Sequence, residues 1–176
     1  MSEVDEAWAQ ALAAAQQRAG AAGRGDVAEY LRLRRSNDLL RQTSIEWLLT
    51  TFTMLAGQAN REGGSLQISR EDGHRFRVGH STMVGRLLKL SFGVRTLSIE
   101  AGWPRVPSDG IIRGGGLACA RIKHLGRRRM DHELLLERST HDEPRWLLRE
   151  PDVTPRRFLE ADVRNHLDKL VSEDYR

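Results

Sequence analysis

The sequence predicts an α+β protein. An antiparallel sheet of about 5–7 strands, roughly residues 65–150, is expected to have N-terminal helices and a C-terminal helix packed on one face. Apolar residues recur every three or four positions before residue 64 and after residue 154, which is the helical period. From residue 65 to about residue 101 they alternate with polar residues, which is the strand period. Strands do not alternate with helices, so a parallel sheet is not expected.

Residues 1–22 are predicted to form a separate peripheral helix or arm, and residues 26–176 to form a single α+β domain. Val4, Trp8 and Leu12 recur every four residues, which indicates a helix with a narrow apolar stripe. A stripe this narrow suits peripheral docking on the domain or contact with a second copy of the chain.

A second helix is expected from Asp26, because Asp26 and Glu29 resemble a capping box. Ser36–Asp38 are expected to interrupt or recap it, since short polar side chains compete for backbone groups. The strongest helical pattern follows, and its apolar positions are Ile45, Leu48, Leu49, Phe52, Leu55, Ala56 and Ala59. We expect this segment to be the central core helix, with Gly63 and Gly64 at its end.

The first predicted hairpin joins two short strands that contain Ile68 and Phe76. A three-residue loop, Glu71–Gly73, places these two apolar residues opposite each other on one face. Gly73 is expected to take the left-handed conformation that such a loop requires.

The second predicted hairpin has a four-residue loop, Gly93–Thr96. This register places Phe92 opposite Leu97 on the core face. It also sets Lys89 opposite Glu100 on the other face, as a favourable cross-strand pair of charges.

The remaining elements are short strands, a glycine-rich bend and a final helix. Strands are expected at Leu134–Leu136 and Trp146–Leu148. Gly114–Gly116 indicate a bulge, a sharp bend, or backbone packed close to the core helix, rather than a phosphate loop, because a predicted strand follows them instead of a helix. Thr154 and Pro155 are typical of a helix start. The inward residues of that helix are expected to be Leu159, Val163, His166, Leu167 and Leu170.

Composition limits the class of protein. The 176-residue chain is 39% hydrophobic and 30% charged, which fits a globular protein with a charged surface. Met1–Glu6 lack the apolar stretch of a secretory signal, and the longest uncharged run, residues 47–60, is too short and too polar to span a bilayer. The lone cysteine, Cys119, excludes an internal disulfide and is expected in the core. We expect a cytoplasmic protein, bacterial in character.

Charge is distributed unevenly along the chain. Residues 61–130 carry 14 lysines and arginines against 5 aspartates and glutamates, whereas residues 131–176 carry 8 against 12. The basic segment can bind an anionic partner, dock on the chain's own acidic end, or form solvated loops. The candidate anion-binding residues are Arg75, Arg77, Arg113, Arg121, Lys123, Arg127, Arg128 and Arg129.

Nucleic acid is expected to be held by charge alone, if it binds. Arg75, Arg77 and Lys89 share the predicted non-core face of the sheet, and that face shows no Phe, Tyr or Trp on which bases could stack.

No catalytic or metal-binding constellation is predicted, and no cofactor. The six histidines lack the His-x3-His and His-Glu-x-x-His spacings of metal sites. A nuclease-like arrangement of Asp109 and Lys123 fails, because Arg121 stands where the second carboxylate is needed.

The leading functional prediction is an intracellular binding module that acts through protein contacts or a basic, anion-binding surface. A protein partner is favoured, nucleic acid is an alternative, no membrane partner is expected, and the N-terminal helix is a candidate for homodimer contact. The sequence leaves enzymatic activity open while favouring its absence. The alternatives are a hydrolase-like enzyme whose residues converge from separate strands, and a small-ligand pocket between the sheet and the core helix. The residues expected to line that pocket are Phe52, Phe76, Phe92 and Trp103.

Overall fold

The computed structural model describes residues 3–139, 143–151 and 153–172. The chain divides into two compact units, residues 1–43 and residues 44–176, and each is described by itself. In chain order the elements are α1 (Glu3–Ala21), α2 (Gly25–Arg61), β1 (Gln67–Val78), β2 (Ser81–Phe92), β3 (Arg95–Trp103), η1 (Pro107–Asp109), β4 (Ala118–His124), η2 (Arg128–Met130), β5 (His132–Arg138), β6 (Pro144–Arg149), β7 (Arg156–Arg157) and α3 (Glu160–Val171).

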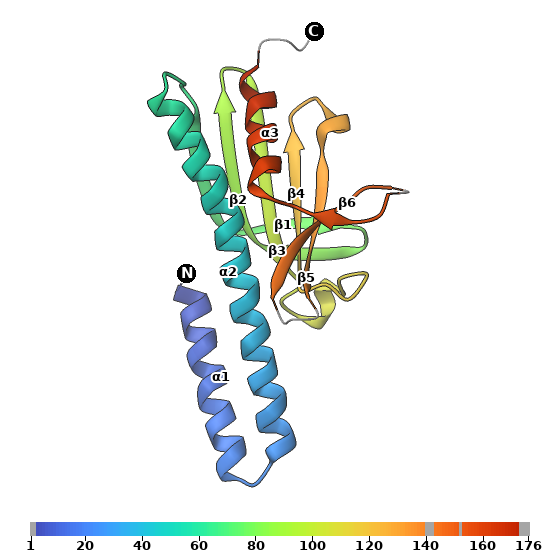
Figure 1. The fold of residues 1–176 in the computed structure, drawn as a ribbon. Coiled ribbons are helices and arrows are strands. Elements are labelled where there is room, and N and C mark those ends of the chain that lie inside the picture. Colours follow the sequence, from blue (N-terminus) through green and yellow to red (C-terminus); the bar gives the residue numbers. More distant parts are fainter. Residues whose placement is uncertain (1–2, 140–142, 152, 173–176) are drawn as a thin grey trace. The chain divides into compact units, whose positions relative to one another are not determined.

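The first unit is a helical hairpin made of α1 and the part of α2 before Ser44 (Figure 1). Trp8 connects the two helices, because its Nε1 donates to Asp38 Oδ2 at 3.4 Å and its ring lies 5.1 Å from the Arg34 guanidinium carbon. Among the residues described in this unit, Leu12 and Ala19 are the buried apolar side chains. The expectation that residues 1–22 act as a separate arm remains a prediction.

The second unit confirms the predicted α+β class. Its seven strands form one antiparallel sheet in the order β1-β2-β3-β4-β5-β6-β7. The later half of α2 and α3 lie on the same face of this sheet (Figure 1). The main core fills the space between them, and its fully buried side chains include Leu48, Phe52, Leu88, Leu90, Leu97, Ile99, Ile122, Leu134, Leu136 and Phe158.

Helix α2 is continuous through Ser36–Asp38, so the predicted interruption is wrong. Its core-facing residues in the second unit are Ser44, Ile45, Leu48, Leu49, Phe52 and Ala56, which confirms the predicted core helix. Trp47 and Met54 are exposed and do not widen the buried face.

The first hairpin differs from the prediction. Residues 67–78 form one long strand, and the turn lies at Gly79–His80, because Val78 pairs with Ser81. Gly73 does take a left-handed conformation, with φ of 70°, but it sits in a β-bulge between Asp72 and His74. A three-residue loop and this kind of bulge both require a left-handed glycine, so the presence of Gly73 in the sequence does not distinguish the loop from the bulge.

This bulge reverses which side chains face the helices. One extra residue shifts the alternation of a strand by one position. Ile68 pairs with Leu90 on the helix-covered face, whereas Phe76 pairs with Met83 on the opposite face. The predicted pairing of Ile68 with Phe76 is therefore wrong.

The second hairpin is shifted by two residues from the predicted register. Phe92 pairs with Arg95 and Leu90 with Leu97, across a two-residue turn that starts at Gly93 with φ of 59°. A shift of two keeps each side chain on its face, so the apolar pattern could not detect the error. Lys89 consequently lies opposite Ser98 instead of Glu100.

Helix α3 begins at Glu160, several residues after the predicted start at Thr154–Pro155. Arg156 and Arg157 first pair with β6, and the Leu159 amide then donates to Asp162 Oδ2 at 2.8 Å, which caps the helix. Leu159 is exposed, but the other predicted inward residues are buried. These are Val163, His166, Leu167 and Leu170.

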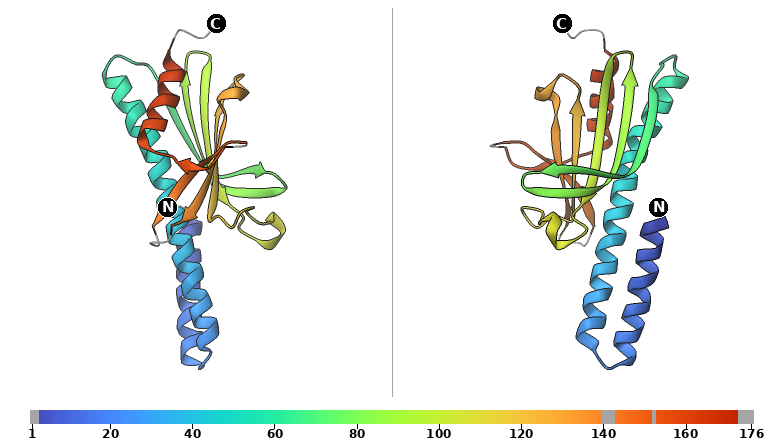
Figure 2. Two further views of the ribbon diagram at one scale, coloured as in Figure 1. Left: turned by 45° about the vertical axis from the view of Figure 1, so that its right-hand side comes forward. Right: turned by 180° about the vertical axis from the view of Figure 1, so that it is seen from behind.

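The two ends of β1 and β2 that meet at their turn bend away from the helices (Figure 2). At the bend Gly85 pairs with Gly102, where the β2 and β3 backbones approach closely. The bend covers a second cluster on the outer face, which we define as the face of the sheet opposite α2 and α3. Its buried members are Phe76, Met83, Cys119 and Leu135.

The glycine-rich bend is confirmed, and it packs on β5. Gly114 and Gly115 have φ of 86° and 73°, and a Cβ on Gly116 would lie 2.3 Å from a Leu135 methyl carbon. Within the described part of the chain, no helix is both long and apolar enough to cross a lipid bilayer.

Candidate functional site

The structure distributes the predicted basic residues over four places. Arg121 and Lys123 lie on the outer face, whereas Arg75 and Arg77 alternate with Phe76 on β1 and point to the other side of that strand. The expectation that Arg75, Arg77 and Lys89 share one face is wrong, because the bulge at Gly73 shifts the alternation between them.

Several of these basic side chains contact the protein itself. Arg75 Nη2 lies 2.9 Å from the buried Asp109 carboxylate, and Lys123 Nζ lies 2.6 Å from Glu100 Oε2. Arg121 Nη1 donates to the Arg77 carbonyl at 2.8 Å, which joins β4 to the folded-over end of β1.

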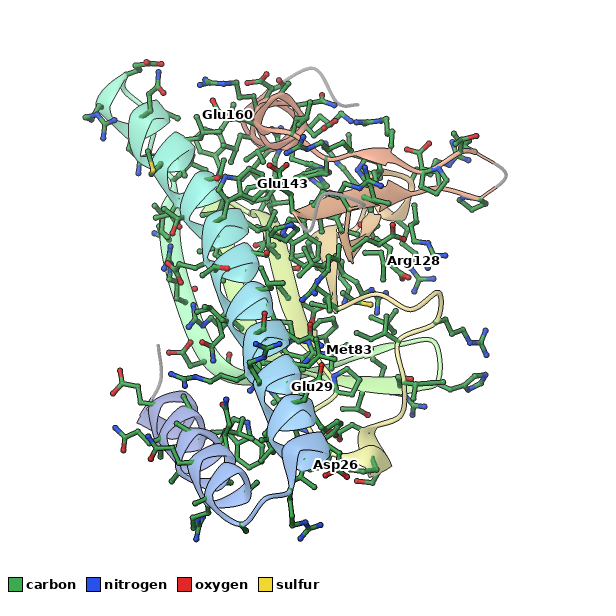
Figure 3. The ribbon with its side chains drawn as sticks, turned by 60° about the horizontal axis from the view of Figure 1, so that its bottom comes forward. Asp26, Glu29, Met83, Arg128, Glu143 and Glu160 are labelled. Atoms are coloured by element: carbon green, nitrogen blue, oxygen red, sulfur yellow. The ribbon has the colours of Figure 1, made fainter. Side chains whose placement is uncertain are left out.

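Arg113 lies in the glycine-rich bend, and its carbonyl accepts from Arg149 at 3.5 Å. The other three arginines form what we call the arginine turn, residues 125–131 between β4 and β5. Arg128 and Arg129 are exposed there, while Arg127 is half-buried. Figure 3 shows Arg128 at this turn, on the outside of the ribbon.

Glu100 is the centre of a polar cluster on the outer face. It is 8% exposed, and its Oε1 lies 2.8 Å from His74 Nε2 while Oε2 faces Lys123. Burial alone raises the pKa of Glu100, but hydrogen bonds and charge from Lys123 and His74 outweigh burial and hold the pKa below its ordinary value. The carboxylate is therefore ionised at neutral pH, with both oxygens engaged by cationic or polar neighbours.

This arrangement corrects the predicted pairing of Glu100 with Lys89. It favours a structural role for Glu100 over a general base, because a base needs an oxygen that a substrate can reach. The sequence offered no signal for the cluster, since His74 reaches Glu100 only because of the bulge in β1.

Three histidines form a second polar cluster, where α3 packs on the end of β4 and the start of β5. His166 of α3 lies between His124, the last residue of β4, and His132, the first residue of β5. His166 Nδ1 is 2.9 Å from His124 Nε2, and His166 Nε2 is 3.0 Å from His132 Nδ1. We call this the histidine chain.

Burial is the largest cause that lowers the pKa of each ring in the histidine chain. It lowers the pKa of His166 to about 3 and that of His124 to about 4, and His132 also falls below its ordinary value. The three imidazoles are neutral at pH 7. Of the three histidines in this cluster, the sequence predicted only His166 to lie near the core.

The structure describes no metal-binding constellation in residues 3–139, 143–151 and 153–172, as no group of three or more His, Cys, Asp or Glu there is arranged to hold an ion. His141 lies outside the described residues. Both ring nitrogens of His166 are used by neighbouring histidines, so this ring has no lone pair left for a metal.

The four aromatic residues that were predicted to line one pocket lie on two opposite faces of the sheet. Phe52 and Trp103 belong to the main core and Phe92 packs at its edge, whereas Phe76 belongs to the second cluster on the other side of the sheet.

Large apolar side chains are exposed on the helical hairpin of the first unit. They are Trp8 at 44%, Leu33 at 52%, Leu39 at 60% and Tyr30 at 61% exposure. Tyr30 and Leu33 are three residues apart and therefore neighbours on one face of α2, whereas Leu39 is nine residues from Tyr30 and lies on the other side of that helix.

Comparison of this chain with protein-family models, with curated proteins and with solved structures finds no match. The functional interpretation therefore depends on the geometry above.

Proposed function

We propose that the chain is a protein-interaction module and that the helical hairpin of the first unit is its binding element. The observation that carries the proposal is the exposure of Trp8, Tyr30, Leu33 and Leu39. An amphipathic helix contributes stability chiefly by burying its apolar face against another element. A partner protein with an apolar helical face would bury the neighbouring pair Tyr30 and Leu33.

The free energy available at this surface is large enough to matter. Full burial of one large apolar side chain contributes about 1.5–3 kcal/mol. Part of that gain is offset by the loss of translational and rotational freedom on association. Two or three buried anchors are therefore enough for a weak to moderate complex, and they would act as its hot spots.

Contacts within the protein make the basic residues on the sheet weaker candidates. Arg75, Arg121 and Lys123 have protein partners at 2.6–2.9 Å, so an anionic ligand would have to compete with those contacts. The engaged carboxylate of Glu100 likewise gives little support to the hydrolase alternative. The buried free thiol of Cys119 agrees with the cytoplasmic location that forms part of this proposal.

The first partner to test is a second copy of the chain, by sedimentation equilibrium from about 1 µM to about 100 µM, a range that covers binding free energies of roughly −8 to −5 kcal/mol. We expect reversible dimers that are lost in the double variant Tyr30→Ser, Leu33→Ser. Arg35→Ser, an exposed polar position on the same helix, is the matched control and should dimerise like the wild type.

A monomer at every concentration redirects the test to other proteins. Photo-crosslinkers at Tyr30 and Leu33 in native cells should then give a discrete adduct, which the same group at Arg35 gives less of. Absence of both dimer and adduct would overturn the proposal.

Anion binding at the arginine turn is a second candidate, supported by the adjacent exposed guanidinium groups of Arg128 and Arg129. The test is retention of generic duplex and single strands at ~50 mM salt, where electrostatic binding is strong. Changing Arg127, Arg128 and Arg129 to Glu should abolish retention if the turn binds, and no retention by the wild type excludes this candidate.

A further inference from the structure

We propose that the histidine chain is a pH-sensitive latch, which fastens α3 and the arginine turn to the end of the sheet and opens when it takes up a second proton. The proposal does not depend on the protein-interaction function above. It follows from how three imidazoles share two hydrogen bonds in a buried place.

The neutral chain satisfies every hydrogen bond between its rings. Each neutral imidazole carries one N–H and one acceptor nitrogen. If His124 donates to His166, then His166 donates to His132, and the two gaps of 2.9 Å and 3.0 Å each hold one proton. The rings of Phe52 and Phe158, each centred 6.3 Å from the His166 ring, complete an apolar surrounding.

A first proton can be accepted without loss of a bond. In the arrangement just described, the free lone pair is at Nδ1 of His124. In the reverse arrangement, in which His132 donates to His166 and His166 donates to His124, the free lone pair is at Nε2 of His132, which is partly exposed and lies 3.7 Å from Glu150 Oε1. A proton that binds the free nitrogen leaves one N–H in each gap, so both hydrogen bonds remain.

A second proton cannot be accepted in this way. The three rings would then carry five N–H groups on six nitrogens, and only two of those nitrogens lie outside the gaps. One gap must hold two N–H groups that point at each other. That hydrogen bond is lost, two positive charges meet in a buried site, and separation of α3 relieves both.

The acidic and basic groups around the three histidines are equal in number, so their charges do not neutralise a second proton. Each neighbouring segment contributes one acidic and one basic group. These groups are Asp131 and Arg127 between β4 and β5, Glu150 and Arg156 in the segment that includes β7, and Asp162 and Lys169 at and within α3. Three acidic and three basic groups leave burial as the dominant influence.

The effect of burial on the pKa values determines the direction in which the stability of the closed latch changes with pH. Each histidine has a lower pKa in the closed latch than in the open one, where its ordinary value is about 6.5. Closure is therefore fully stable above about pH 6.5 and weakens as the pH falls toward 4. Each extra proton bound by the open state increases opening by up to tenfold per pH unit.

The test is hydrogen–deuterium exchange of the full chain, which reads opening of α3 from its own amides after correction for intrinsic exchange. Between pH 6 and pH 5 we expect the opening constant of α3 to rise more than tenfold, which one histidine alone cannot produce. The double variant His124→Phe, His166→Phe should show a smaller rise. His80→Gln, at the exposed turn after β1, is the matched control and should behave like the wild type.

A second measurement serves if the double variant does not fold. Nitrogen-15 NMR of the wild-type imidazoles reports protonation of each ring directly. We expect His166 to remain neutral in the folded protein at pH 5.5, with one protonated ring nitrogen. A charged His166 in folded protein at that pH, or α3 exchange that rises no more than tenfold, would overturn the proposal.

Discussion

Replacing Gly85 with alanine should destabilise the second unit strongly. A Cβ at this position would lie 1.9 Å from the Ala101 carbonyl oxygen and 2.6 Å from Gly102 Cα. The first distance is about 1.5 Å short of van der Waals contact, and both obstacles are backbone of β3. No flexible side chain can move aside, so β2 and β3 must separate.

The magnitude follows from what separation breaks. Neighbouring strands lie about 4.8 Å apart, and an increase of about 1.5 Å is incompatible with the ladder hydrogen bonds beside the bend. Overpacking costs typically 1–3 kcal/mol, and each lost hydrogen bond adds about 1 kcal/mol. We expect a loss of about 3–5 kcal/mol in the free energy of unfolding.

Urea unfolding, followed by circular dichroism and by tryptophan fluorescence, measures this loss. Gly79→Ala is the matched control. Gly79 has φ of 59° and no heavy atom within 4 Å of an added Cβ, so it should lose only about 1 kcal/mol from backbone strain. If Gly85→Ala unfolds within about 1 kcal/mol of the wild type with an unchanged m-value, the close-approach reasoning is wrong.

Three other perturbations have defined outcomes. Gly73→Val should cost about 1 kcal/mol or more in urea unfolding, because a β-branched residue resists φ of 70°, and an unchanged midpoint would contradict the bulge. Glu100→Gln should cost about 1–3 kcal/mol at pH 7, because Lys123 loses its buried partner. Because the folded pKa of Glu100 is lowered, its stabilisation is fully present above the unfolded pKa of about 4.5. The stabilisation is lost as the pH falls through the folded pKa, so the difference in stability between the variant and the wild type should shrink as the pH falls below about 4.5. Burial raises the pKa of Cys119 to about 12. A thiol reagent at pH 8 should therefore label the native protein slowly and the urea-unfolded protein fast. Rapid labelling of the native protein would contradict this, because it would show that the thiol is accessible.

The sequence was sufficient for the fold class and for many of the residues that enter the main core. Apolar period alone identified the core segment of α2 and the inward residues Val163, Leu167 and Leu170 of α3. These predictions succeed because the hydrophobic effect acts on whole faces, and a face is defined by local spacing.

Strand register was not predictable in the same way. A shift of two residues leaves every face unchanged, so the pairing of Leu90 with Leu97 could not be chosen over Leu90 with Ile99 by pattern. The left-handed glycine at Gly73 was recognised, but its bulge reversed the faces of β1 after residue 73. One extra residue therefore moved Arg75 and Arg77 away from the face on which they were expected.

The candidate sites were less predictable than the fold, for a geometric reason. His124, His132 and His166 come from two strands and a helix, and Glu100 meets His74 only where β1 bends over the outer face. Neither cluster has a local motif. The histidine cluster depends on the register of β4 with β5 and on the packing of α3, and the Glu100 cluster depends on the bulge in β1. Hydrophobic periodicity does not determine these features.

The same reasoning decides how the basic segment should be interpreted. Its surplus of charge suggested an anionic ligand or the chain's acidic end as the partner. Arg70, Arg75, Arg86 and Lys123 of this segment form ion pairs with acidic residues from before or within the segment, which are Glu46, Asp72, Glu100 and Asp109. A sum of charges along the sequence counts these paired groups as available, whereas an approaching polyanion meets mainly the exposed arginines. The arginine turn is therefore where the anion-binding hypothesis should be tested first, and exposed apolar residues of the helical hairpin remain the stronger basis for a partner.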